Sequence, residues 1–174
     1  MLILRRPRTD DEPRVRAIHA RMAQEGFEFL FHADREWPQI LAQFDAEAAG
    51  EDLPPGRVPC DFLLAEVDGE IVGRTSIRHQ LNDFLLAYGG HVGYGVAPEH
   101  RRRGYATEIL RQSVRRLAEL GVGRVLVTCD DDNTGSATVI EACGGVLEDV
   151  RPMVGEADKH RYWITASPTA ASVG

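Results

Sequence analysis

One amphipathic helix between two apolar strands constrains the fold of this chain more than any other feature. From Arg103 onward, apolar residues recur every three or four positions and form a single stripe that ends at Gly121. The glycine-containing stretch His91–Val96 precedes this helix, and the largely apolar run Arg124–Cys129 follows it. A strand, a crossover helix and a second strand form a βαβ unit, whose second strand is buried on both faces. The chain is therefore predicted to belong to the α/β class.

The rest of the sequence predicts further helices and strands around this unit. Two alternating segments, 62–67 and 71–78, are joined by the turn pair Asp68-Gly69 and indicate a β-hairpin. Helices are predicted over 11–24, where Pro13 is tolerated in the first turn, and over 34–49, which ends at Gly50. A shorter helix is predicted over about 134–143, with strands near 145–150 and 159–165. These elements describe an α/β (α+β) domain.

Length and composition limit how this domain can be organised. The chain has 174 residues, enough for one sizeable domain and too few for a second. Its hydrophobic fraction of 43% and charged fraction of 27% are close to globular averages, which excludes a disordered or fibrous chain and a disulfide framework. We expect a single domain over residues 1–165 and a flexible tail over 166–174.

Charge and cysteine content indicate the compartment and exclude some partners. No apolar run approaches the roughly 18–20 residues that span a bilayer, so no membrane partner is expected. Cys60, Cys129 and Cys143 lack CxxC spacing and favour free thiols in a reducing compartment, hence a cytoplasmic protein, while a disulfide between two of them stays open. The formal net charge of −7 argues against a nucleic-acid partner. Any polyanion must therefore meet a local basic site.

A basic segment with this property lies between the strand 91–96 and the long helix. It runs from Pro98 to Ala106 and contains three consecutive arginines followed by Gly104. A helix N-terminus offers about four unpaired N–H groups and a partial positive charge, which suit phosphate. The small residues Gly104 and Ala106 let a ligand approach those amides. The segment matches neither the Walker pattern nor GxGxxG. A solvated helix start is the alternative explanation, and the spacing of the small residues favours a phosphate site.

The spacing Arg101-x-x-Gly104-x-Ala106 after a Gly-Val-Ala-Pro strand end resembles the acetyl-CoA pyrophosphate loop of the GNAT superfamily of N-acetyltransferases. The likeness continues through Val125–Thr128, through Asp132–Ser136 and through Ile140–Gly145, so it covers residues 62–145 in order. Gly89–Tyr94 is similar to a bacterial branch of predicted acetyltransferases. The first 61 residues, which shape the acceptor site in this family, match only loosely.

The resemblance implies a fold, a co-substrate and an activity. The fold would be a mixed, mainly antiparallel central sheet of about six or seven strands flanked by about four helices. Acetyl-CoA, without any metal, would lie between the strands that end at Val96 and Cys129, with its pyrophosphate on the loop amides. The implied cofactor-binding residues are Val96, Ala97, Arg101, Arg102, Arg103, Gly104, Tyr105, Ala106, Thr107, Asn133 and Ser136.

The implied reaction is N-acetyl transfer to a primary amine, which attacks the thioester directly in a ternary complex. A small-molecule acceptor is expected more than a protein acceptor, and a homodimer is possible. The alternative from another class is a non-catalytic acyl-CoA-binding or sensing module. Aromatic residues at Phe27, Phe29, Phe31 and Trp37 either line the acceptor pocket or, the favoured alternative, form core.

His91 and Tyr94 are the candidate catalytic residues. A histidine, with an unperturbed pKa of about 6.5, suits a base acting through water, and a tyrosine suits a general acid near the thiolate. Strand alternation puts the two side chains on opposite faces, so one of them is expected to reach the site. The family's tyrosine acid, seven residues after Asn133, is replaced by Ile140. That role therefore falls to no assigned residue, to water, or to a hydroxyl such as that of Ser136.

Overall fold

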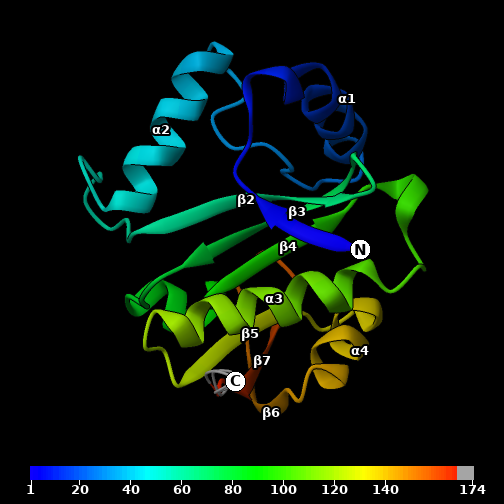
Figure 1. Ribbon diagram of the computed structural model, residues 1–174. Helices are drawn as coiled ribbons and strands as arrows, with labels where there is room; N and C mark the ends of the chain where they lie inside the picture. The colour runs from blue at the N-terminus through cyan, green and yellow to red at the C-terminus, as the bar shows by residue number, and fades with distance from the viewer. Residues whose placement is uncertain (168–174) are drawn as a thin grey trace, which may run out of the picture.

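A computed structural model describes residues 1–167, which fold into seven strands and four α-helices (Figure 1). In chain order the elements are β1 (Leu2–Arg5), α1 (Glu12–Ala23), α2 (Trp37–Ala49), β2 (Cys60–Val67), β3 (Glu70–Arg78), β4 (Val92–Val96), α3 (Tyr105–Glu119), β5 (Arg124–Asp130), α4 (Thr134–Ala142), β6 (Val146–Arg151) and β7 (Lys159–Thr165). Short helical turns also form at Thr9–Asp11, Leu85–Gly89 and Pro98–His100.

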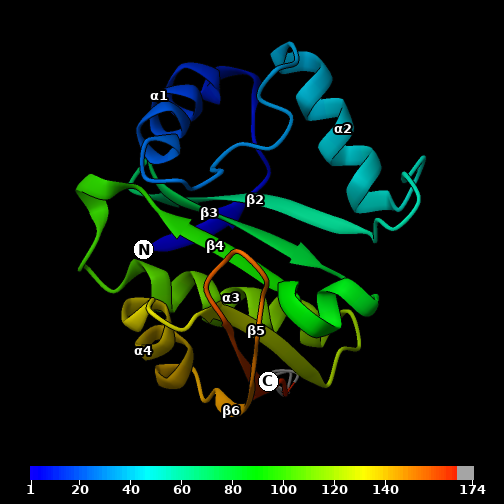
Figure 2. The same cartoon turned by 180° about the vertical axis from the view of Figure 1, so that it is seen from behind.

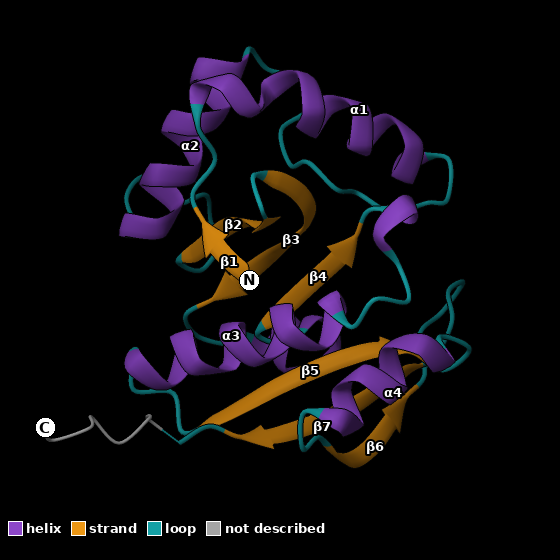
Figure 3. Cartoon of the chain, turned by 45° about the vertical axis from the view of Figure 1, so that its right-hand side comes forward, coloured by secondary structure: helices purple, strands orange, loops and turns teal. Residues whose placement is uncertain are grey.

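The first sheet is antiparallel and has the order β1-β2-β3-β4. Helices α1 and α2 cover one face, and α3 lies on the opposite face (Figures 1 and 3). The β2–β3 hairpin turns at Asp68 and Gly69, whose φ values are 51° and 83°. Two consecutive positive φ values are what a tight hairpin turn requires, and an Asp-Gly pair provides them at low cost. The predicted hairpin is therefore confirmed.

The second sheet has the order β5-β7-β6 and is also antiparallel. Its central strand, β7, comes last in the sequence and pairs with both of the others. Apolar side chains of β5 and β7 pack against α3 through Val125, Val127, Ile164, Leu110 and Leu117. The long apolar stripe of α3 is thus buried against strands on both sides of it.

The two sheets are joined where β4 begins. The backbone N–H of His91 donates to the carbonyl oxygen of Leu126 at 2.7 Å, and the N–H of Leu126 donates to His91 Nδ1 at 2.9 Å. Gly90 precedes this junction with φ +63°, and a Cβ added there would lie 2.7 Å from the Leu126 oxygen. Beyond the junction, β4 and β5 share no ladder in the described part of the chain. The parallel strands of the predicted βαβ unit therefore diverge.

The sequence-based prediction of the fold class and of the flanking helices is confirmed, with three differences in detail. The seven strands form two sheets where one was expected. Strand β1 was not predicted, because Leu2–Arg5 is short and ends in an arginine that pairs with Asp11 and Glu66. Ala166, the first residue of the expected tail, is buried, and its N–H donates to the Gly123 oxygen. Residues 168–174 lie outside the described residues.

Two further sequence-based expectations concern cysteines and membranes. Cys60, Cys129 and Cys143 all carry free thiols, as predicted. Burial raises the pKa of the Cys60 and Cys129 thiols to about 11, so both stay protonated at neutral pH. None of the helices within residues 1–167 combines the length and the apolar character needed to cross a bilayer.

Candidate functional site

A cleft of about 800 Å³ lies where β4 and β5 diverge. The end of β4 lines it through Tyr94, Gly95 and Val96, and the first turns of α3 and α4 form its sides. Because both helices begin at this cleft, the partial positive charges of two helix N-termini face the same space. The cleft therefore favours an anionic ligand.

The loop between β4 and α3 presents backbone N–H groups to this cleft. Arg102 and Gly104 have left-handed backbone conformations, with φ of 64° and 80°. Within residues 1–167, the N–H groups of Arg102, Arg103 and Gly104 have no hydrogen-bond acceptor, and the first turn of α3 adds further unpaired N–H groups. A Cβ added at Gly104 would meet nothing within 4 Å. Successive free amides facing open space form a concave site suited to phosphate.

Most of the predicted cofactor residues line the cleft: Val96, Arg101, Arg102, Gly104, Tyr105, Ala106, Thr107, Asn133 and Ser136. Two do not. Ala97 is fully buried in the core with α1 and α2, because its extended backbone turns its side chain away from that of Val96. Arg103 is exposed and is not among the lining residues. The side chain of Ala97 therefore lies in the core and not in the cleft.

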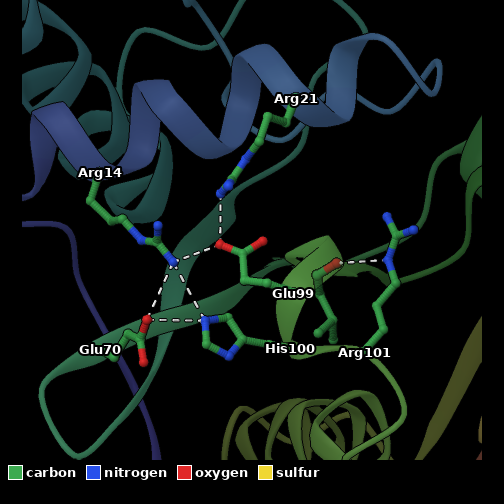
Figure 4. A network of polar contacts seen from close by, with 7 residues as sticks. Arg14, Arg21, Glu70, Glu99, His100 and Arg101 are labelled. Carbon is green, nitrogen blue, oxygen red and sulfur yellow. Dashed lines mark hydrogen bonds and ion pairs between the residues drawn. The ribbon is translucent and has the colours of Figure 1, made fainter.

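Ion pairs hold the loop against α1 (Figure 4). The Glu99 carboxylate accepts hydrogen bonds from Arg14 at 2.8 Å and from Arg21 at 2.7 Å. Arg101, predicted as the main phosphate contact, donates to the Val96 carbonyl and pairs with Glu25 at 2.5 Å. Its charge is therefore already partly neutralised. The loop amides are therefore less compensated donors than Arg101.

Two hydroxyl groups meet at the inner end of the cleft. Tyr94 Oη and Ser136 Oγ lie 2.9 Å apart. Burial raises the pKa of Tyr94 to about 12, so the phenol stays protonated at neutral pH. Asn133 begins α4, and its Oδ1 accepts the N–H of Ser136 at 3.0 Å, which fixes the serine. Ile140 is fully buried and does not line the cleft.

A second pocket, of about 520 Å³, lies on the other side of this hydroxyl pair. The α1–α2 connection, β3, β4 and the β6–β7 loop line it, and Figure 2 shows that loop rising toward β4. Phe27, Tyr94, Asn133 and Ser136 line both cavities. The cleft and the second pocket therefore meet at Tyr94 and Ser136.

The aromatic residues of the α1–α2 connection divide between pocket and core. Phe27 and Phe31 are half-buried and line the second pocket. Phe29 and Trp37 are buried in the core cluster. The prediction of core residues is therefore confirmed for Phe29 and Trp37, and Phe27 and Phe31 line a pocket instead.

His91 lies at the junction of the two sheets. Its side chain is 5% exposed, its Nδ1 accepts the N–H of Leu126, and it lines neither cavity. Burial, together with the nearby charge of Arg78, lowers the pKa of His91 to about 4. A base must reach the acceptor or a water beside it, and this environment does not provide such access. The geometry favours a role in joining the sheets over the predicted role of base.

This placement predicts a pH dependence of stability. The native pKa of His91 is about 4, below the unfolded value of about 6.5, so the unfolded chain binds the proton more readily between these values. The free energy of unfolding should therefore fall by up to about 3 kcal/mol from this residue as pH drops from 6.5 to 4. The substitution His91→Asn removes the titratable imidazole, while the amide oxygen of asparagine still accepts a hydrogen bond from the N–H of Leu126. Urea unfolding at pH 7, 5 and 4 should show that the free energy of unfolding decreases less in the variant than in the unmodified chain. Equal decreases in both proteins would contradict a lowered pKa of His91.

Several lining residues were not predicted. On β3, Arg74 and Arg78 line the second pocket, and on α4, Thr134 and Thr138 line the cleft. The two arginines, four residues apart, were visible in the sequence, but they are equally typical of a strand with one face in solvent. No local signal distinguishes these two cases.

Comparison with known proteins gives a family and a set of similar folds. The model of the acetyltransferase (GNAT) domain family matches residues 1–146. RimJ of Mycobacterium smegmatis, solved with CoA-disulfide, is 25% identical, with a TM-score of 0.71 over 95% of this chain and 82% of that one. YncA of Salmonella typhimurium, a putative acetyltransferase solved with acetyl-CoA, is 17% identical, with a TM-score of 0.66 over 98% and 96%.

A third similar structure is a chimera of the spermidine N-acetyltransferase SpeG from Vibrio cholerae with hSSAT. It is 14% identical and has a TM-score of 0.66 over 95% of this chain and 95% of that one. These structures share the arrangement of strands and helices described above.

Proposed function

Because the chain belongs to the GNAT acetyltransferase family, we propose that it transfers the acetyl group of acetyl-CoA to an amine, by direct attack in a ternary complex. One observation carries this proposal: two cavities meet at the Tyr94–Ser136 hydroxyl pair, and the larger one is lined by unpaired backbone amides. Such an arrangement brings two substrates together at a proton donor. Proximity of this kind supplies much of the acceleration in a bimolecular reaction.

The cleft fits the donor substrate. The amides of Arg102–Gly104 and of the first turn of α3 suit a pyrophosphate, and open space over Gly104 leaves room for it. The edge of β4 that faces away from β3 has no strand partner past His91 in the described residues. Unpaired strand edges bind extended amide-containing ligands, and the pantetheine arm contains two amides. The chain therefore offers matching groups to both halves of the donor.

The second pocket would hold the acceptor, with its amine directed at the hydroxyl pair. The neutral amine forms the new N–C bond, the C–S bond breaks, and the proton of the amine passes to water in the pocket. The Tyr94–Ser136 pair donates a hydrogen bond to the departing thiolate. A thiol has a pKa of about 8.5, well below about 12 for Tyr94. The hydroxyl pair therefore stabilises the thiolate as a donor, without giving up its proton completely.

The hydroxyl pair also bears on the alternative function. A module that only senses acyl-CoA needs a binding cleft but no proton donor between that cleft and a second pocket. With Ile140 at the position of the family's tyrosine, the departing thiolate has no hydrogen-bond donor from that residue. The hydroxyl groups of Tyr94 and Ser136 would provide one from a neighbouring position. We therefore favour the enzyme over the sensing module.

A calorimetric titration with acetyl-CoA, followed by a free-thiol assay with a panel of amines, tests the proposal. We expect one acetyl-CoA to bind per chain, and thiol release above the amine-free blank for one class of amine. Absence of binding would overturn the donor site. Binding without thiol release from any amine of the panel would favour the sensing module.

A further inference from the structure

Two arginine side chains of β3 reach the second pocket without a carboxylate partner. Arg74 and Arg78 are four residues apart on one strand and therefore lie on the same face of the sheet. Within residues 1–167, the hydrogen bonds of both guanidinium groups go to carbonyl and hydroxyl oxygens, and none goes to a carboxylate. Two positive charges thus lie together without a carboxylate hydrogen-bonded to either of them.

Arg74 is the more deeply buried of the two. It is 4% exposed, and it donates to the carbonyl oxygens of Phe29 at 3.1 Å, Glu28 at 2.5 Å and Gly93 at 3.0 Å. Its guanidinium carbon lies 4.8 Å and 4.9 Å from the ring centres of Phe27 and Phe31. Burial lowers the pKa of Arg74 to about 9, so it remains charged at neutral pH. Carbonyl dipoles and aromatic rings offset part of the cost of burying this charge, and they leave the charge itself in place.

Arg78 retains free donors. Its Nη1 donates to the Gly89 oxygen at 3.1 Å and to the Gly90 oxygen at 3.3 Å. Its Nε and Nη2 atoms have no acceptor among the described residues, and Arg78 lines the pocket. Burial lowers its pKa as well. Nε and Nη2 are the edge that binds a carboxylate in the bidentate geometry.

Both guanidinium groups flank one position on β4. A Cβ added at Gly93 would lie 3.7 Å from Arg74 Nη1 and 3.8 Å from Arg78 Nη1. The glycine leaves this position free of side-chain atoms. Gly93 directly precedes Tyr94, so their side-chain positions are on opposite faces of the sheet. Because β4 is an edge strand, both residues still line the second pocket, together with Arg74, Arg78 and Ser136. The two positive charges are therefore within the reach of one small molecule that also reaches the hydroxyl pair.

The other charged groups of the pocket do not neutralise these arginines. Lys159 pairs with Asp130, and Glu156 lies 4.0 Å from the same lysine. The remaining carboxylate of the lining belongs to Glu28, which is exposed; its charge opposes the lowering of the Arg74 pKa, but it accepts no hydrogen bond from either guanidinium group. In a chain with a formal net charge of −7, this positive pair is a local exception. A bound anion would compensate it.

We propose that the acceptor is a small amine that also carries a carboxylate or a similar oxyanion, and that Arg78 and Arg74 bind this anionic group over Gly93. This inference rests on the proposed function, because it takes the second pocket as the acceptor site. An amine without the anionic group would leave the arginines unpaired in the complex. Sites built to bind a polar group reject analogues that lack it by large factors.

The test compares matched amines in the thiol-release assay at a fixed acetyl-CoA concentration. The panel contains amino acids with their C-terminal amides, aminoalkylphosphonates with the corresponding amino alcohols, and short peptides with free N-termini. We expect kcat/KM for the anionic members to exceed that of their neutral partners by about 100-fold or more. Equal use of neutral partners, preference for peptides, or no reaction of any anionic member while acetyl-CoA still binds would each overturn the inference. Loss of acetyl-CoA binding itself would overturn the proposed function instead.

Arg78→Gln assigns the preference to this residue. The variant should lose most of the kcat/KM for the anionic amine and keep that for the neutral partner, with acetyl-CoA affinity unchanged. Arg115→Gln, on the exposed side of α3, makes the same change in charge away from the pocket and should keep the preference. Equal losses for both amines in Arg78→Gln would assign Arg78 a structural role and contradict the inference.

Gly93→Ala provides a second variant if Arg78→Gln fails to fold. The added methyl group would occupy the position between the guanidinium groups and leave both arginines in place. Its closest contact, 3.0 Å from Ser76 Oγ, is with a side chain that can rotate. This variant should lose the preference for anionic amines as well. Retention of the full preference would show that the anion does not bind over Gly93.

Discussion

Replacing Gly104 by glutamate should weaken acetyl-CoA binding about 100-fold or more and leave the fold intact. The glutamate carboxylate would lie beside the amides that are to bind the pyrophosphate, and two unit charges about 4 Å apart repel by about 4 kcal/mol near a protein surface. The site has φ +80°, which costs a non-glycine residue about 1–2 kcal/mol. No atom lies within 4 Å of the added Cβ, so no clash should unfold the chain. Calorimetry measures the affinity, and thermal unfolding checks the fold.

Gly121 provides a matched control at the other end of α3. It has φ +85°, and a Cβ added there also meets nothing within 4 Å. Gly121→Glu therefore introduces the same charge and similar backbone strain away from the cleft, and acetyl-CoA affinity should not change. Gly104→Ala separates strain from charge and should weaken binding far less than glutamate. If Gly104→Glu binds acetyl-CoA as tightly as Gly121→Glu does, the loop does not hold the phosphates.

Removing either hydroxyl of the pair should lower kcat about 100-fold, the lower end of the range for a positioned proton donor. The oxygens of Tyr94 and Ser136 lie 2.9 Å apart and act on the thiolate together. Tyr94→Phe and Ser136→Ala should therefore each cost about as much as the double variant, since groups that act as a unit are not additive. Acetyl-CoA affinity should change by less than about threefold. Single-turnover kinetics with the preferred amine provides the measurement.

A second hydroxyl pair in the same protein serves as the control. Thr75 Oγ1 and Ser113 Oγ lie 3.0 Å apart, buried between β3 and α3 and outside both cavities. Ser113→Ala should lower the free energy of unfolding by about 1 kcal/mol and leave kcat unchanged. If the fold-decrease in kcat of the double variant equals the product of the fold-decreases in the two single variants, Tyr94 and Ser136 act independently. If kcat does not fall at all, water rather than the hydroxyl pair stabilises the thiolate.

Local patterns were sufficient to predict most of the fold and the position of the loop that we propose as the donor site. The Asp68-Gly69 turn, the stripe of α3 and the spacing of Gly104 each depend on residues close in the sequence, and the structure places all three as predicted. Strand β1 could not be predicted in this way. Its stability depends on ion pairs of Arg5 with Asp11 and with Glu66, and the latter lies far away in the sequence.

The second pocket, which we propose as the acceptor site, depends on contacts that no local pattern contains. Arg74 and Arg78 have the spacing of residues on a solvent-facing strand, yet Arg74 donates to the α1–α2 connection and Arg78 to the carbonyl oxygens of Gly89 and Gly90. For His91 the sequence instead suggested a functional role, because a histidine at the start of the strand that leads into the loop is a candidate base. Its bond to Leu126 at the sheet junction requires the position of β5, which the sequence alone does not supply.

The position of β7 has a consequence for synthesis of the chain. Strands β5 and β6 pair only with β7 in the described structure, so the second sheet lacks its central strand until residues 159–165 have left the ribosome. The first sheet, by contrast, is complete once β4 has emerged, and it can form while synthesis continues. Until β7 has emerged, β5 and β6 have unpaired edges, which are prone to association with other chains. Nascent chains halted before β7 should therefore aggregate through these two strands and bind no donor substrate.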